Sequence, residues 1–189
     1  MVYADQYPQD VAGIVLVDAA HPDQDERFPP EAREVDYMGD LKRALYITKA
    51  EIGFMRLFET SVYDGISYQG LAELKTLPQT TPGLFAEMDA VDQILDEARE
   101  TRGFGSLPLI VLTAGRMPGN LPPAITPDIL SQIEKTKSEL QIELTALSNI
   151  GEQRIIPDAG HYIHYGRPDA VIRAIRDVVS AVQEAPRQE

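Results

Sequence analysis

His161 is the residue whose type and setting best suit chemistry. It follows a short apolar run, 153–157, and stands directly after Gly160, with a helix expected to begin at Pro168. A glycine there permits a sharp turn that aims the next side chain across the ends of the strands, where open α/β sheets bind ligands. A neutral imidazole in that place can accept a hydroxyl proton and return it to a leaving group. The alternative is a histidine that only hydrogen-bonds its loop.

The other two histidines are weaker candidates. His164 lies three residues after His161, where it would satisfy the loop or extend to solvent. His21 follows the first apolar run within Ala-Ala-His-Pro, and stabilising that turn is a better interpretation than chemistry.

Three apolar, β-branched runs predict the strands that position these residues: 13–18, 107–113 and 153–157. Helical sequence separates them, which predicts parallel strands joined by crossover helices and hence an α/β fold. Helices are expected to begin at Thr81-Pro82, at Thr126-Pro127 and at Pro168. The second should bury a stripe that Lys137 interrupts. The third should pack a broad apolar stripe on the sheet: Val171, Ile172, Ile175, Val178, Val179 and Val182.

Almost ninety residues separate the first two strands, far more than the roughly dozen that a crossover needs, which predicts an inserted subdomain. Its large apolar residues are expected to form its own core and its contact with the sheet, and together could line an apolar pocket. They are Tyr37, Met38, Leu41, Leu45, Tyr46, Phe54, Met55, Leu57, Phe58, Tyr63 and Tyr68.

The order of these segments resembles the C-terminal part of an α/β-hydrolase. Residues 3–24 are similar to the tail of that family's elbow helix, its Tyr-Pro break and the next strand. Residues 107–115 resemble the following strand, and Asp158-Ala-Gly-His-Tyr-Ile-His164 resembles the loop that carries the catalytic histidine. The resemblance implies a single truncated domain over 1–189, with three parallel strands and with 23–106 as a helical lid or cap insertion.

The resemblance also bears on the acid that would orient His161. The family usually places it just beyond the strand that here ends at Gly115, but no carboxylate occurs there before Asp128, which is better explained as a first-turn acid favoured by its helix dipole. Some members carry the acid one strand earlier, which implies Asp18. An aspartate there would receive the imidazole N–H and stabilise the imidazolium. The alternative for Asp18 is a hydrogen bond to its own turn through Ala19 and Ala20.

The sequence lacks the serine motif that carries the nucleophile in the family it resembles. None of the seven serines stands in a G-x-S-x-G, and the family's chain order places the nucleophile before the acid and the histidine. The expectation is therefore that the motif precedes Met1 in the gene and that the chain alone is inactive. The serines are Ser61, Ser67, Ser106, Ser131, Ser138, Ser148 and Ser180.

The composition argues against several kinds of partner and site. Seventeen basic and thirty acidic residues give a net charge of −13, which argues against nucleic acid and membrane surfaces as partners. With no cysteine and three scattered histidines, we expect no metal site and no cofactor. No apolar run approaches the roughly 18 residues of a membrane helix, and a cytoplasmic location is expected.

The sequence therefore predicts part of a hydrolase that acts on an ester, amide or related bond of a small apolar molecule, with His161 and Asp18 as catalytic residues. The alternative is a non-catalytic binding or interaction module, a pseudo-hydrolase whose exposed sheet edge pairs with another chain. For the isolated chain, the open edge predicts either self-association or loose packing. A nucleotide-binding domain is disfavoured because no glycine-rich phosphate motif follows any strand.

Overall fold

The computed structural model describes residues 1–33, 40–54, 80–117, 119 and 121–184. Its compact parts are two units, one made of Met1–Arg33 with Leu95–Glu189 and the other of Glu34–Ile94. The second unit lies within the predicted insertion 23–106.

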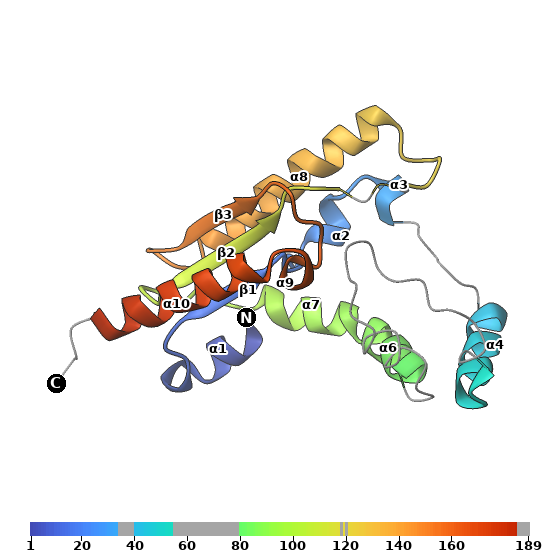
Figure 1. Cartoon of the computed structure of the whole chain (residues 1–189), viewed down its shortest axis with the longest axis horizontal. Coiled ribbons are helices and arrows are strands. Elements are labelled where there is room, and N and C mark those ends of the chain that lie inside the picture. The colour runs from blue at the N-terminus through green and yellow to red at the C-terminus, as the bar shows by residue number, and fades with distance from the viewer. Residues whose placement is uncertain (34–39, 55–79, 118, 120, 185–189) are drawn as a thin grey trace. The chain divides into compact units, whose positions relative to one another are not determined.

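The first unit is an α/β structure with a three-stranded sheet in the order β1-β2-β3 (Figure 1). Both strand pairs are parallel, with Ile14 opposite Leu109 and Ile110 opposite Glu152, as the sequence predicts. Its elements are α1 (Val2–Gln6), η1 (Pro8–Asp10), β1 (Ile14–Val17), α2 (Gln24–Arg27), α3 (Pro30–Arg33), β2 (Leu109–Ala114), α8 (Pro127–Thr145), β3 (Glu152–Ile156), α9 (Ile163–Gly166) and α10 (Pro168–Glu184), with the end of α7 (Val91–Arg99).

Helices cover both faces of this sheet, which is why β2 is buried throughout its length. Side chains alternate along β2, so Leu109 and Val111 pack toward Leu144 of α8, while Ile110 and Leu112 pack on the face that α10 covers. Figure 1 shows α8 and α10 on opposite sides of the strands. The parallel register brings the carboxyl ends of all three strands to one edge of the sheet.

Helix α8 begins as the sequence predicts. Thr126 is its N-cap, and the Thr126 hydroxyl accepts a hydrogen bond from the Ile129 amide at 3.4 Å, with Pro127 in the first turn.

The stripe predicted to pack α10 on the sheet is wrong in part. The buried residues are Ala170, Ala174 and Val178, spaced four apart. Ile172, Ile175 and Val179 are instead exposed, at 48%, 48% and 47%. Small alanine side chains allow a helix to approach a sheet closely along a narrow line, so only part of a broad apolar stripe is covered.

Two helices occupy the place of the single helix predicted to begin at Thr81-Pro82. The first, α6 (Thr80–Asp89), begins before Thr81, and α7 ends at Arg99. Ala90 lies between them in a turn.

The second unit contains α4 (Asp40–Glu51) and α6, which pack against each other. The Tyr46 ring meets the Phe85 ring edge-on at 6.4 Å between centroids, and the Arg43 guanidinium lies 4.6 Å from the centroid of Phe85. Of the large apolar residues named for the insertion, Leu45, Tyr46 and Phe54 are exposed. The others lie outside the residues whose side chains are described, so the predicted lid and pocket stay predictions.

In the part of the chain that the structure describes, no helix is both long enough and apolar enough to span a membrane.

Candidate functional site

The candidate site lies where the three strands reach their carboxyl ends, and its centre is Asp18. This residue directly follows β1 and is buried, with 3% of its side chain exposed. Its φ is 45°, in the left-handed region that aspartate tolerates better than most residues. The turn ends β1 and leaves the carboxylate at the edge of the sheet.

The Asp18 carboxylate continues the β1–β2 ladder after the backbone has turned away. The Asp18 amide donates to the Leu112 carbonyl at 2.7 Å, as in a parallel ladder. The next bond would join the Ala114 amide to the Asp18 carbonyl, but that amide donates to Asp18 Oδ1 at 2.8 Å. Asp18 therefore bonds the neighbouring strand, which differs from the alternative of a bond within its own turn.

Asp18 and His161 form a hydrogen-bonded pair, although 143 positions separate them in the chain. The distance between Asp18 Oδ2 and His161 Nδ1 is 2.9 Å. The sequence predicted this contact only through the resemblance. The geometry brings the two predicted site residues together, and their catalytic roles remain a proposal.

Lys137 of α8 is the third member of the cluster, and the sequence analysis missed it. Its Nζ lies 3.0 Å from Asp18 Oδ1 and donates to the Ala114 carbonyl at 3.3 Å. A signal was present, because Lys137 interrupts the apolar stripe of its helix, between the buried Ile133 and Leu140. A lysine on the buried face of a helix requires a partner.

The surroundings of Asp18 keep it ionised. Burial by itself raises the pKa of this carboxyl, but the hydrogen bonds from His161 and the Ala114 amide, with the Lys137 ammonium, outweigh that effect and leave the pKa below its usual value. An ionised carboxylate only accepts hydrogen bonds, so His161 Nδ1 must carry the proton. The lone pair of the neutral ring is therefore on Nε2.

His161 itself is open to solvent, with 65% of its side chain exposed. Among the residues that the structure describes, Nε2 has no hydrogen-bond partner, so it is available to a reacting group. The ring also lies 5.0 Å from that of Tyr162.

Gly160 does not have the role predicted for it. Its φ is outside the left-handed region, and a Cβ there would meet only Arg116 Nη2, at 4.0 Å. The chain instead turns at Pro157 and Asp158, directly after β3. Glycine is therefore not required for the turn that presents His161.

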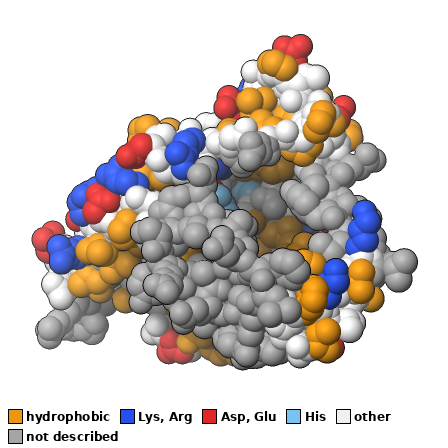
Figure 2. Space-filling model, turned by 45° about the vertical axis from the view of Figure 1, so that its right-hand side comes forward, with side chains coloured by type: hydrophobic (Ala, Val, Ile, Leu, Met, Phe, Trp, Pro, Cys, Tyr) orange, Lys and Arg blue, Asp and Glu red, His pale blue; other side chains and the backbone are white. Residues whose placement is uncertain are grey.

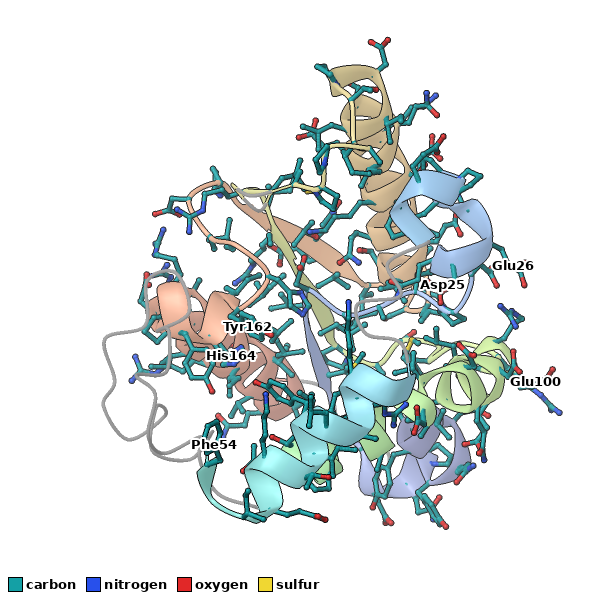
Figure 3. All side chains as sticks on the ribbon, turned by 90° about the vertical axis from the view of Figure 1, so that its right-hand side faces the viewer. Asp25, Glu26, Phe54, Glu100, Tyr162 and His164 are labelled. Carbon is teal, nitrogen blue, oxygen red and sulfur yellow. The ribbon has the colours of Figure 1, made fainter. Side chains whose placement is uncertain are left out.

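Neither of the two other histidines is bonded to Asp18 in the described part of the chain. His21 Nδ1 accepts a hydrogen bond from the Asp23 amide at 3.1 Å, which is the turn-stabilising role predicted for it. His164 lies on α9 beside Tyr162, as Figure 3 shows, and its ring centroid is 4.1 Å from that of Tyr165.

The other carboxylates considered lie outside the cluster. Asp128 is exposed in the first turn of α8. Asp158 accepts two hydrogen bonds from Arg167 Nη1, at 2.5 and 2.7 Å. No group of three metal-ligating side chains is found among the described residues.

Comparison of the chain with protein-family models, with curated proteins and with solved structures finds no match. The likeness to α/β-hydrolases therefore stays a resemblance.

Proposed function

We propose that the chain is the acid–base part of an α/β-fold hydrolase that cleaves an ester, amide or related bond of a small molecule. The observation that carries the proposal is the 2.9 Å bond between a buried aspartate and an exposed histidine whose second nitrogen is unpartnered among the described residues. A purely structural pair would not require a basic nitrogen that faces solvent. This pair leaves one at the sheet edge where α/β proteins bind their ligands.

The proposed chemistry follows from the tautomer of His161, which has its proton on Nδ1 and its lone pair on Nε2. His161 Nε2 accepts the proton of an attacking hydroxyl and later returns it to the leaving group. Between these steps the ring is an imidazolium, and Asp18 stabilises its charge through the Nδ1–H bond. The hydrogen bonds from His161 and the Ala114 amide, together with Lys137, keep Asp18 ionised and in place.

The attacking group comes from outside this cluster. Of the described serines, Ser148 is buried near the opposite end of β2, where its hydroxyl donates to the Leu107 carbonyl at 2.6 Å. Ser131 donates to the Pro127 carbonyl within α8 at 3.0 Å. Neither is hydrogen-bonded to His161, which accords with the lack of a G-x-S-x-G in the sequence.

The test is the effect of Asp18→Asn on hydrolysis of nitrophenyl esters, measured in whichever form of the protein carries a nucleophile, this chain alone or this chain within a longer one. An amide holds the position but cannot stabilise the imidazolium, so kcat should fall by about 10³- to 10⁴-fold, while circular dichroism shows an unchanged fold. Asp128→Asn is the matched control and should change kcat less than twofold. If Asp18→Asn keeps full activity, the pair is structural and the interaction-module alternative gains.

A further inference from the structure

Two backbone hydrogen bonds just after β2 hold Arg116 beside the loop that presents His161. The Gly115 amide donates to the Ile156 carbonyl at 2.9 Å, and the Arg116 amide donates to the Ala159 carbonyl at 3.0 Å. A Cβ on Gly115 would lie 2.7 Å from the Cα of Pro157, so only glycine permits this close approach. The backbone of Arg116 is thus attached to the loop that presents His161.

The side chain of Arg116 extends over the same loop. Its Nη2 lies 4.0 Å from the position that a Cβ on Gly160 would occupy, one residue before His161. The residue is exposed, and within the described part of the chain its guanidinium has no hydrogen-bond or ion-pair partner.

Arg116 differs in this respect from most other arginines of the described part of the chain, which are paired with carboxylates. In a chain of net charge −13, acidic partners are abundant, and Figure 2 shows red and blue side chains interleaved on the surface. Most of the arginines whose side chains are described are paired with carboxylates, namely Arg27, Arg43, Arg99, Arg154, Arg167 and Arg173.

Two further arginines have no side-chain partner in the described region, and their places in the fold differ from that of Arg116. Arg102 precedes β2, on the side of its amino end, and Arg176 is on the exposed face of α10. Only Arg116 of these three follows a strand at the edge that carries Asp18 and His161.

Two carboxylates in the described part of that edge are already bonded to other groups. Asp18 is bonded to Lys137 and His161, and Asp158 is bonded to Arg167. Neither carboxylate is bonded to Arg116 in the described part of the chain, and the Arg116 side chain is exposed next to the loop that presents His161.

We propose that Arg116 binds a carboxylate group of the substrate and so orients the scissile bond toward His161 Nε2. A guanidinium offers a planar fork of N–H donors that matches a carboxylate, which favours this anion over a neutral polar group. This inference rests on the proposed function and sharpens it: the substrate class becomes monoesters or monoamides that retain a free carboxylate, rather than purely apolar molecules.

The experiment measures binding, which needs no nucleophile. Monomethyl succinate, an anion, and dimethyl succinate, its neutral counterpart, are titrated at constant ionic strength into the ¹⁵N-labelled chain. The anion should shift the amide resonances of Gly160 and His161, and the neutral ester should shift them weakly or not at all. Arg116→Gln should weaken binding of the anion by at least about tenfold, and Arg116→Lys should keep part of it, because lysine retains the charge but loses the fork.

Arg176→Gln is the matched control, since it removes an unpaired arginine elsewhere, and it should leave binding unchanged. Equal binding of the two esters would overturn the inference, and so would retention of anion binding by Arg116→Gln. An equal loss in Arg176→Gln would also overturn it, because the binding would then reflect overall charge. Failure of these titrations leaves the Asp18→Asn kinetics untouched, and failure of those kinetics leaves the titrations untouched, so the two proposals can fall separately.

Discussion

The loops that follow β1 and β3 each carry a histidine at the same edge of the sheet, and they use it in opposite ways. His21 has 12% of its side chain exposed: Nδ1 accepts from the Asp23 amide, and Nε2 lies 3.5 Å from Glu143. His161 has 65% exposed and one nitrogen engaged. Figure 3 shows the α2 side of the strands, with Asp25 and Glu26, opposite the side with Tyr162 and His164. Both histidines follow a strand, and they differ in whether a ring nitrogen is left without a partner among the described residues.

The environments of the two loops explain this difference. Ion pairs join the β1 loop and its neighbours: Arg99 bonds Asp23 at 2.7 Å, and Arg27 bonds Glu143 at 2.6 Å. The histidine of the β3 loop is instead bonded through Nδ1 to the buried carboxylate of Asp18, at 2.9 Å. The first arrangement fixes a turn, and the second presents a base.

The largest expected effect is the loss of hydrolysis on removal of His161. If His161→Ala and His21→Ala had equal effects on kcat, the two histidines would not differ in role. In a form of the protein that has a nucleophile, His161→Ala should lower kcat by about 10⁴- to 10⁶-fold, because the general base is lost. His21→Ala should change kcat less than about tenfold, since its two nitrogens serve the fold. For this chain alone, we expect a rate on short-chain nitrophenyl esters no higher than that of His161→Ala. Turnover by the chain alone that His161→Ala abolishes would show that one of its own residues is the nucleophile.

The second effect is on stability and concerns Lys137, which bonds the aspartate that holds His161. Lys137→Met leaves the buried Asp18 with two of its three polar partners, which should lower the free energy of unfolding by about 1–3 kcal/mol. Urea denaturation at pH 7 measures it. Lys135→Met is the control, because Lys135 is 79% exposed and 4.0 Å from Glu139, and it should cost less than about 0.5 kcal/mol.

The Lys137→Met variant should also be less stable toward acid than the wild type. The folded pKa of Asp18 is depressed, so its stabilising effect is full above the unfolded value of about 3.9 and is lost as the pH falls through the folded value. Removing the lysine raises the folded pKa, so Lys137→Met should unfold at a higher pH in an acid titration. An unchanged acid midpoint would mean that Lys137 does not hold Asp18 ionised.

The smallest effect concerns His21. Burial lowers the pKa of its imidazole, and the nearby Arg27 and Arg99 act in the same direction, whereas Asp23 and Glu143 oppose them. As the pH falls below about 6.5, the unfolded chain takes up this proton first, so stability is full above that pH and is lost as the pH falls through the folded pKa. The wild type should therefore lose somewhat more stability between pH 7.5 and pH 5 than His21→Asn, by less than about 1 kcal/mol. Thermal melts across this range measure the difference, and equal slopes would show that His21 is not held neutral.

Much of the sheet could be predicted because its signals are local. The three β-branched runs become β1, β2 and β3 to within two residues at each end, and Thr126 caps α8. Capping, strand propensity and the alternation of apolar residues depend on neighbours in the chain, so the sequence alone contains them.

Which surfaces are covered depended on tertiary structure. The apolar stripe of α10 is present in the sequence, but the choice of Ala174 over Ile175 as a contact is made by the distance and rotation at which the helix meets the sheet. The role of Lys137 is similar, because its interruption of a stripe is visible in the sequence while its partner is not.

The sequence by itself determined that this chain is an α/β protein with a histidine after its third strand and an aspartate after its first. Only the tertiary structure brought them to 2.9 Å across the end of β2 and supplied Lys137 from α8. The physical reason is that the parallel pairing of β1, β2 and β3 places their carboxyl ends at one edge. Residues far apart in the chain therefore meet there through the register of the hydrogen-bonded strands, which no local pattern encodes.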